Sequence, residues 1–248
     1  MSAAISALLI FTSLFTAFIS GIFGMAGGMI LMGLLALLLP VEAVFVTHGV
    51  LQLVANGWRA VLHRRHIQGR IFGWFTLATL AAALCISVIA FVPSKPVLFL
   101  LLGLMPVLLW LPKGWFQADA ARPTHAFGAG FLATLLTLTA GVSGPLIDTV
   151  FVRTGLDRHQ IVATKAAIQC LNHISKIAVY GLLLLKSGQG GVPPIWLFAL
   201  AIPASMLGTT AGGWVLDWMN DTNFKRWTAW IVTGIGLVYL VRAAMLWV

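Results

Sequence analysis

The chain has 248 residues, of which 60% are hydrophobic and only 8% are charged, whereas soluble globular proteins have about 25% charged residues. Together with a mean hydropathy of +1.00, this composition excludes a soluble domain and predicts an integral membrane protein. The formal net charge of +9 does not indicate a nucleic-acid partner, because the basic residues lie in short segments between apolar runs, where the positive-inside rule explains them.

Apolar runs of about 20 residues, the length that crosses a bilayer, recur along the sequence, and the residues between them are too few to fold separately. We therefore expect one all-α, polytopic transmembrane bundle that forms a single domain, residues 1–248. The runs are continuous rather than alternating, which excludes an outer-membrane β-barrel. No basic segment precedes the first run, which predicts a retained helix rather than a cleaved signal. In chain order, the predicted helices cover residues 4–20, 29–39, 42–63, 71–92, 97–111, 127–140, 146–152, 159–185, 195–214 and 224–247.

Two glycine-rich breaks interrupt apolar segments, and each precedes a helix whose polar residues share one face. The first break contains Gly24, Gly27 and Gly28, and its helix carries Thr47, His48, Gln52, Asn56 and Arg59. The second break contains Gly141, Ser143 and Gly144, and its helix carries Thr164, Lys165, Gln169, Asn172 and Lys176. From Lys165 onward these residues are spaced by four, three and four, which places them on one side of an α-helix.

A constant offset of 117 residues aligns the two breaks and the two polar helices without a gap. Polar residues are scarce in this chain, so their coincidence predicts an internal duplication, as in many transporter folds. The aligned pairs are Gly24 and Gly141, Gly27 and Gly144, Thr47 and Thr164, Gln52 and Gln169, and Arg59 and Lys176. We expect repeat one at residues 1–111, a polar linker at 112–125 and repeat two at 126–248.

Loop charges predict the orientation of the bundle in the membrane. The loop with Arg64, Arg65 and Arg70 is expected in the cytoplasm, and the positive-inside rule is best met if each Gly-broken segment is re-entrant and makes an even number of crossings. The basic loop residues then expected outside are Lys95, Lys186 and Arg242, and those inside also include Lys113, Arg122, Arg153, Arg158, Lys225 and Arg226. Each half then makes an odd number of crossings, so the repeats are inverted and both termini lie outside. If the broken segments cross once instead, the repeats are parallel.

The breaks and their polar helices together predict an anion site. A charged residue in the middle of a spanning helix costs about 2.5–3.5 kcal/mol, so Lys165 needs a wet cavity or a partner, and we expect it to supply the principal charge. A broken helix frees backbone N–H groups, and a free helix N-terminus attracts an anion. All sixteen residues named above for the breaks and their helices are therefore predicted to bind substrate. The alternatives are polar residues that pair with one another, snorkelling of Arg59, and glycines that serve close helix packing.

Asp148 is the only acid in the short apolar piece after the second break, and it aligns with Leu31 of the first half. We expect it to pair with a basic residue, and a proton relay that couples transport is the alternative. Cys85 and Cys170 lie within apolar helices and predict neither a disulfide nor a metal site. The six histidines show no ligand spacing on one membrane helix, so no metal and no cofactor are expected.

A second chemistry is suggested by residues 141–144, which resemble the Gly-x-Ser-Gly of rhomboid intramembrane serine proteases, with Ser143 as nucleophile and His173 as base. A protease requires one nucleophile and one base, not two matched polar helices, and the first break has Ala26 where the second has Ser143. The sequence therefore favours a transporter over an enzyme. The protease and an anion channel are kept as alternatives.

At these residues the chain resembles the sulfite exporter TauE/SafE family, also called the toluene sulfonate uptake permease family. The resemblance covers essentially the whole length and rests on the two glycine-rich signatures and on Val46-Thr47-His48 and Ala163-Thr164-Lys165. The usual Gly-x-Gly-Gly-Gly run followed by a proline is altered here, with Ala26 inside the run and Gly33 at the proline position. The resemblance implies a bacterial inner-membrane secondary carrier for sulfite or an organosulfonate. The expected partners are a small anion and the lipid bilayer, and a homo-oligomer is left open.

Overall fold

The computed structural model describes residues 2–23, 26–89, 91–111, 118–151, 154–188, 190–218 and 221–247, and all regular structure within them is helical. The all-α prediction is therefore confirmed for the described residues. The elements are α1 (Ala3–Phe23), α2 (Ala26–Leu38), α3 (Val41–Leu62), the 3₁₀ turn η1 (Arg64–His66), α4 (Gly69–Ile89), α5 (Lys95–Leu104), α6 (Val107–Trp110), α7 (Pro123–Thr139), α8 (Gly144–Phe151), α9 (Arg158–Ser187), α10 (Ile195–Trp218) and α11 (Asp221–Trp247).

Five of the described helices are long and apolar enough to cross a membrane, namely α1, α4, α9, α10 and α11. Their outward faces carry large apolar side chains such as Leu84 and Leu207, as expected of surfaces that face lipid tails. The protein is therefore a multi-pass membrane protein. By contrast, α2 and α8 have 13 and 8 residues, which is shorter than the roughly 20 residues that a spanning helix requires.

Proline and glycine set several helix boundaries. The helix expected over residues 97–111 is divided into α5 and α6, because Pro106 has no N–H to continue the hydrogen-bond ladder. The helix α7 begins at Pro123, four residues before the predicted start, because proline is well suited to a first turn. At the second break Gly141 has a φ of 80°, which L-residues rarely adopt, and a side chain there would overlap Met32.

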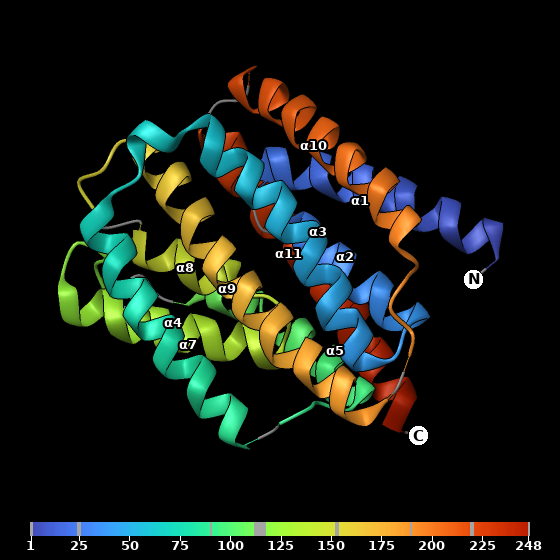
Figure 1. Ribbon diagram of the computed structural model, residues 1–248. Helices are drawn as coiled ribbons and strands as arrows, with labels where there is room; N and C mark the ends of the chain where they lie inside the picture. The colour runs from blue at the N-terminus through green and yellow to red at the C-terminus, as the bar shows by residue number, and fades with distance from the viewer. Residues whose placement is uncertain are drawn as a thin grey trace.

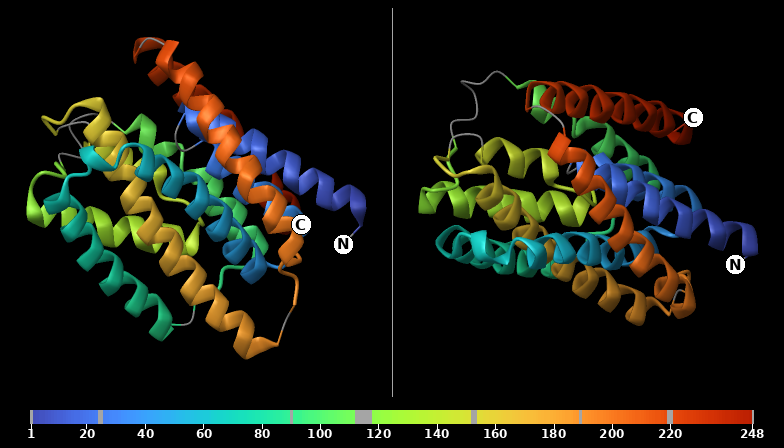
Figure 2. Two further views of the ribbon diagram at one scale, coloured as in Figure 1. Left: turned by 45° about the horizontal axis from the view of Figure 1, so that its top comes forward. Right: turned by 90° about the horizontal axis from the view of Figure 1, so that it is seen from above.

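The antiparallel pair α3 and α9 lies at the centre of the bundle, between the α1–α10 pair on one side and the α4–α7 pair on the other (Figure 1). Figure 2 shows α11, which packs on α5, on the face opposite α3 and α9. The offset of 117 residues aligns α1 with α7 and α4 with α10. The helix α1 packs on α10, and α7 packs on α4, so each pair contains one helix from each half. The two polar helices are thus brought face to face.

Two tyrosine side chains, one from α9 and one from α11, bind backbone carbonyls beside the two breaks. Tyr180, whose ring stacks on Phe45 with 4.0 Å between centroids, donates from its hydroxyl to the carbonyl of Leu138. Tyr239 donates to the carbonyl of Met29 over 2.8 Å. Leu138 lies in the last turn of α7, where carbonyls have no intrahelical partner and must be satisfied by other groups in an apolar environment. The tyrosines therefore hold the interrupted segments in place next to α3 and α9.

Candidate functional site

A small polar cavity of about 30 Å³ lies where the two breaks meet α3 and α9. Its volume corresponds to about two water-sized spheres. The lining residues come from six helices and the second break, and they are Ser20, Gly28, His48, Gln52, Asn56, Thr137, Val142, Ser143, Gly144, Gln169, Asn172 and His173. Eight of these residues belong to the predicted substrate site. The structure therefore gathers half of the sixteen predicted residues around one cavity.

Three pairs of lining residues are separated by 117 positions, the same offset that aligns the two halves. Gln52 faces the cavity with Gln169, and Ser20 does so with Thr137. In the third pair, the Asn56 side-chain amide and Nε2 of His173 are in direct contact at 3.3 Å. Ser20 and Thr137 were not predicted, although the offset alone aligns them as hydroxyl residues shortly before each break. His173 was considered only as a protease base.

Asn172 is fixed by hydroxyl groups from neighbouring helices. Its Oδ1 lies 2.9 Å from the hydroxyl of Thr134 on α7 and 3.3 Å from that of Thr79 on α4. Its amide nitrogen is directed to the hydroxyl of Ser143, which also accepts from Thr137 over 2.8 Å. Because the oxygen of Asn172 is occupied by donors, the amide N–H groups are the part of this side chain that is available to a ligand. A ligand that accepts hydrogen bonds is therefore favoured here.

His173 holds a buried donor, unpartnered among the described residues, beside the cavity. The Asn56 amide donates to Nε2 of His173, so in the neutral ring the proton is carried by Nδ1. Nδ1 is buried and has no hydrogen-bond partner among the described residues. A buried donor without a partner costs about 1–3 kcal/mol, which a bound ligand or water would remove. The unpartnered N–H of His173 therefore favours a bound group that accepts hydrogen bonds.

His48 joins the cavity to a buried lysine. The Nε2 atom of His48 lies 2.9 Å from the carbonyl oxygen of Gly28, and its Nδ1 atom lies 2.7 Å from Nζ of Lys176. A carbonyl can only accept, so Nε2 carries the ring proton and Nδ1 accepts from the lysine. Lys176 also donates to the carbonyl of Gly141 over 2.9 Å and lies 5.7 Å above the centre of the Phe45 ring. Both His48 and Lys176 are 0% exposed.

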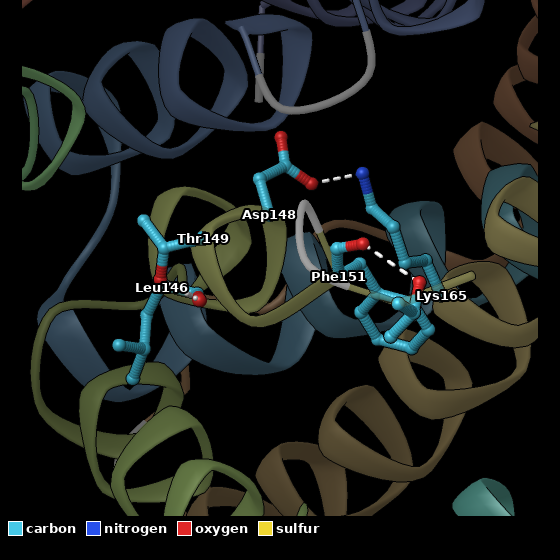
Figure 3. Close-up of polar contacts among 6 residues, drawn as sticks. Leu146, Asp148, Thr149, Phe151 and Lys165 are labelled. Carbon is cyan, nitrogen blue, oxygen red and sulfur yellow. Dashed lines mark hydrogen bonds and ion pairs between the residues drawn. The ribbon is translucent and has the colours of Figure 1, made fainter. Parts of the chain in front are cut away.

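Lys165, the predicted principal charge, does not line the cavity. It forms an ion pair with Asp148 that joins α9 to α8, and the two side chains are 22% and 28% exposed (Figure 3). Asp148 thus pairs with a basic residue, as the sequence favoured. The positive charge of Lys165 is already balanced by this carboxylate. Among the described residues, no carboxylate lies within 4 Å of the other two interior cations, Arg59 and Lys176.

Of the remaining predicted residues, those that the structure describes do not line the cavity. Arg59 donates to the carbonyl of Ser20 over 2.9 Å, and the hydroxyl of Thr164 accepts from the backbone of Gln68. The hydroxyl of Thr47 is buried without a partner among the described residues. Gly27 is in close contact with the backbone of α1, where an added side chain would overlap the Thr16 carbonyl, which matches the close-packing alternative. Gly24 lies outside the described residues.

The arrangement of Ser143 and His173 does not favour a serine protease. Ser143 and His173 line the same cavity, but the hydroxyl of Ser143 is bound to Thr137 and Asn172 rather than to His173. The nucleophile and the base of a protease must be in hydrogen-bond contact.

Comparison with known proteins identifies a family for almost the whole chain. The family model described as Sulfite exporter TauE/SafE matches residues 9–239, a range that runs from α1 into α11 and includes every residue that lines the cavity. No curated protein and no solved structure matches the chain significantly. The chain therefore belongs to the sulfite exporter TauE/SafE family of membrane transporters.

Proposed function

We propose that this protein is a secondary carrier of the bacterial inner membrane that moves a small oxyanion, sulfite or a short organosulfonate, by alternating access around the central cavity. The observation that carries this proposal is the polar cavity between the two breaks, which presents hydrogen-bond donors and has a buried lysine directly behind it. Fully ionised sulfite and sulfonates present only acceptor oxygens, so a site of this kind matches them in charge and in hydrogen bonding.

The electrostatics of the lining support an anion rather than a cation. The described lining residues include no Asp or Glu, whereas Asn172 has amide N–H groups directed to Ser143 at the cavity wall. The first turns of α2 and α8 also reach the cavity through Gly28 and Gly144, and the N-terminal ends of helices carry partial positive charge. Lys176 adds positive charge through His48, which it contacts. A cation in this cavity would face all of these groups unfavourably.

The arrangement of the helices supports inverted repeats, repeat one at residues 1–111 and repeat two at 126–248 within a single domain. The helices α3 and α9 occupy corresponding positions and run antiparallel, and Asn56 touches His173, its counterpart 117 residues later. Antiparallel counterparts are related by a two-fold axis that lies in the membrane plane, which is the symmetry that alternating access uses. In this arrangement α2 and α8 are re-entrant segments.

Counterflow in proteoliposomes tests the proposed function. Vesicles that contain the purified protein and are preloaded with unlabelled sulfite should take up radiolabelled sulfite transiently, and the uptake should saturate. Methanesulfonate and sulfoacetate would be tested as competitors, and Asn172→Leu should reduce uptake at least tenfold because it removes the oriented donor. Absence of counterflow with every anion of this group would overturn the carrier, and flux that rises linearly without counterflow would indicate a channel. Ser143→Ala tests the protease alternative, because loss of a peptidase signal in this variant would support the protease.

A further inference from the structure

Lys176 and His48 form a buried basic pair, and no carboxylate of the described residues balances its charge. We infer that this pair is the binding site of a proton that is carried together with the anion, so that transport is anion–proton symport. The inference rests on the proposed function and adds the identity of the coupling ion. Asp148, the sequence candidate for coupling, is engaged by Lys165 instead.

The environment of Lys176 provides the first step. Its Nζ has two hydrogen-bond acceptors, Nδ1 of His48 and the carbonyl of Gly141, and both are uncharged groups in their ordinary state. Among the described residues, it has no carboxylate within 4 Å. An ion buried without an opposite charge is strongly disfavoured, so this site alternates between two states: proton-free and neutral, or protonated with an anion nearby.

The second step is the connection from the lysine to the cavity. His48 contacts Lys176 with one ring nitrogen and itself lines the cavity, and its ring lies 5.8 Å from that of His173. A proton on Nζ can move along the 2.7 Å contact to Nδ1 of His48, which leaves a neutral amine and a positively charged imidazole. In both forms one positive charge lies beside the cavity. Release of that proton to water returns both groups to the neutral state, and no other bond is made or broken.

The sign of the coupling follows from the electrostatics. An anion in the cavity stabilises the protonated pair, and the protonated pair stabilises the bound anion by the same free energy, because linkage is reciprocal. Ligands that favour each other's binding are carried in the same direction. Exchange of an anion for a proton would instead require that each ligand exclude the other, and the geometry places the two charges together.

Other ionisable groups around the pair do not replace it. The helices α3 and α9 and the elements packed on them, α2, α4, α7, α8, α10 and η1, contribute the following described groups: Glu42, Arg59, Arg64, Arg65, His66, Arg70, Cys85, His125, Asp148, His159, Lys165, Cys170, His173, Tyr180 and Lys186. Of these, His173 is the one whose ring contacts that of His48. Asp148 and Lys165 neutralise each other on the α8 side of α9.

Two variants that lock the charge of Lys176 test the inference. Lys176→Met is permanently neutral and Lys176→Arg is permanently charged, so neither can bind and release a proton in a transport cycle. Lys186→Met, at the exposed end of the same helix, is the matched control. Each protein would be reconstituted and assayed twice with radiolabelled sulfite, once for counterflow and once for accumulation driven by a pH gradient at clamped membrane potential.

For one proton per anion, the wild type and Lys186→Met should accumulate sulfite by up to about tenfold per pH unit. Both Lys176 variants should show counterflow but no accumulation above the level without a gradient. The half-saturation concentration should be higher in Lys176→Met, which lacks the positive charge, than in Lys176→Arg. Sulfite itself binds protons near neutral pH, so the comparison between wild type and variants is decisive. If no anion shows counterflow with the wild type, the proposed carrier function fails.

Three results would overturn the coupling site while leaving the carrier intact. The first is wild-type counterflow without any response to the pH gradient. The second is a gradient response in Lys176→Arg equal to that of the wild type, since a group that does not release its proton cannot couple. The third is loss of counterflow in both Lys176 variants but not in Lys186→Met, which would assign Lys176 to anion binding or folding alone.

Discussion

Arg59 and Lys176 occupy aligned positions on α3 and α9, and each donates to a backbone carbonyl at a helix break, Ser20 for the arginine and Gly141 for the lysine. Their neighbours differ. Lys176 contacts His48 in a fully buried environment, whereas the residue aligned with His48 is Lys165, which is partly exposed and paired with Asp148. The same framework thus holds a balanced ion pair on one side and an unbalanced basic pair on the other. The two halves therefore share the positions of their basic residues, but the groups that these residues pair with differ between the halves.

The largest expected effect comes from removing the partner of the buried lysine. His48→Leu leaves Nζ of Lys176 with the Gly141 carbonyl alone, and loss of a hydrogen bond to a buried charged group costs about 1.5–3 kcal/mol of stability. Thermal unfolding in detergent should show a large decrease in Tm. The double variant His48→Leu/Lys176→Met should recover part of the loss, because no charge then remains buried. A single variant as stable as the wild type would show that Lys176 does not depend on His48.

Gly141 in the second break should be less tolerant of a side chain than Gly28 in the first. Gly141→Ala places a side chain at a φ of 80° and against Met32, so we expect a loss of about 1–3 kcal/mol in the free energy of unfolding. Gly28→Ala in the first break is the matched substitution, since the added carbon would be at an ordinary distance of 3.6 Å from Gln52. Unfolding curves of the two variants in the same detergent test this order. Equal stability of the two would contradict it.

On the other side of the comparison, loss of the ion pair should have a modest effect. Lys165→Met removes a pair whose members are partly exposed to water, and such pairs contribute about 1 kcal/mol or less. The decrease in Tm should be much smaller than for His48→Leu. If Lys165 were instead the principal charge for the anion, as the sequence suggested, this variant would lose counterflow at every anion concentration.

The smallest effect concerns the starts of the two central helices. The helix α9 begins with a capping box in which Asp157 accepts from the backbone of Gln160 over 2.9 Å, whereas α3 begins after Pro40 without a side-chain cap. The hydrogen bond from the Gln160 backbone lowers the pKa of Asp157 from its ordinary value of 3.8. The stabilisation is therefore complete above about pH 3.8 and is lost as the pH falls through the lower, folded pKa.

Comparison of Tm for the wild type and Asp157→Ala across pH tests this assignment. The difference should be small and constant near neutral pH, because the cap is exposed, and it should shrink as the acid is protonated below pH 3.8. A difference that grows in acid would contradict it.

Much of the candidate site was accessible from the sequence because polar residues are rare in this chain. Gln52, Gln169, Asn56 and Asn172 were predicted from helical spacing, and all of them line the cavity. Lys165 was predicted to supply the principal charge for the anion, whereas in the structure its charge is balanced by Asp148 on α8. Lys176 was predicted only as one of the other substrate-binding residues. Helical spacing identifies which residues share a face, but it does not specify which residue of another helix will be opposite.

The sequence by itself determined the membrane class, the helical fold, the two breaks and the offset of 117 residues, since hydropathy, glycine and proline act locally along the chain. The tertiary structure alone decided which cation is neutralised and which is left with neutral partners. That outcome depends on distances between α3, α8 and α9, which are set by packing rather than by spacing in the sequence. It is also the feature from which the proposed coupling to a proton follows.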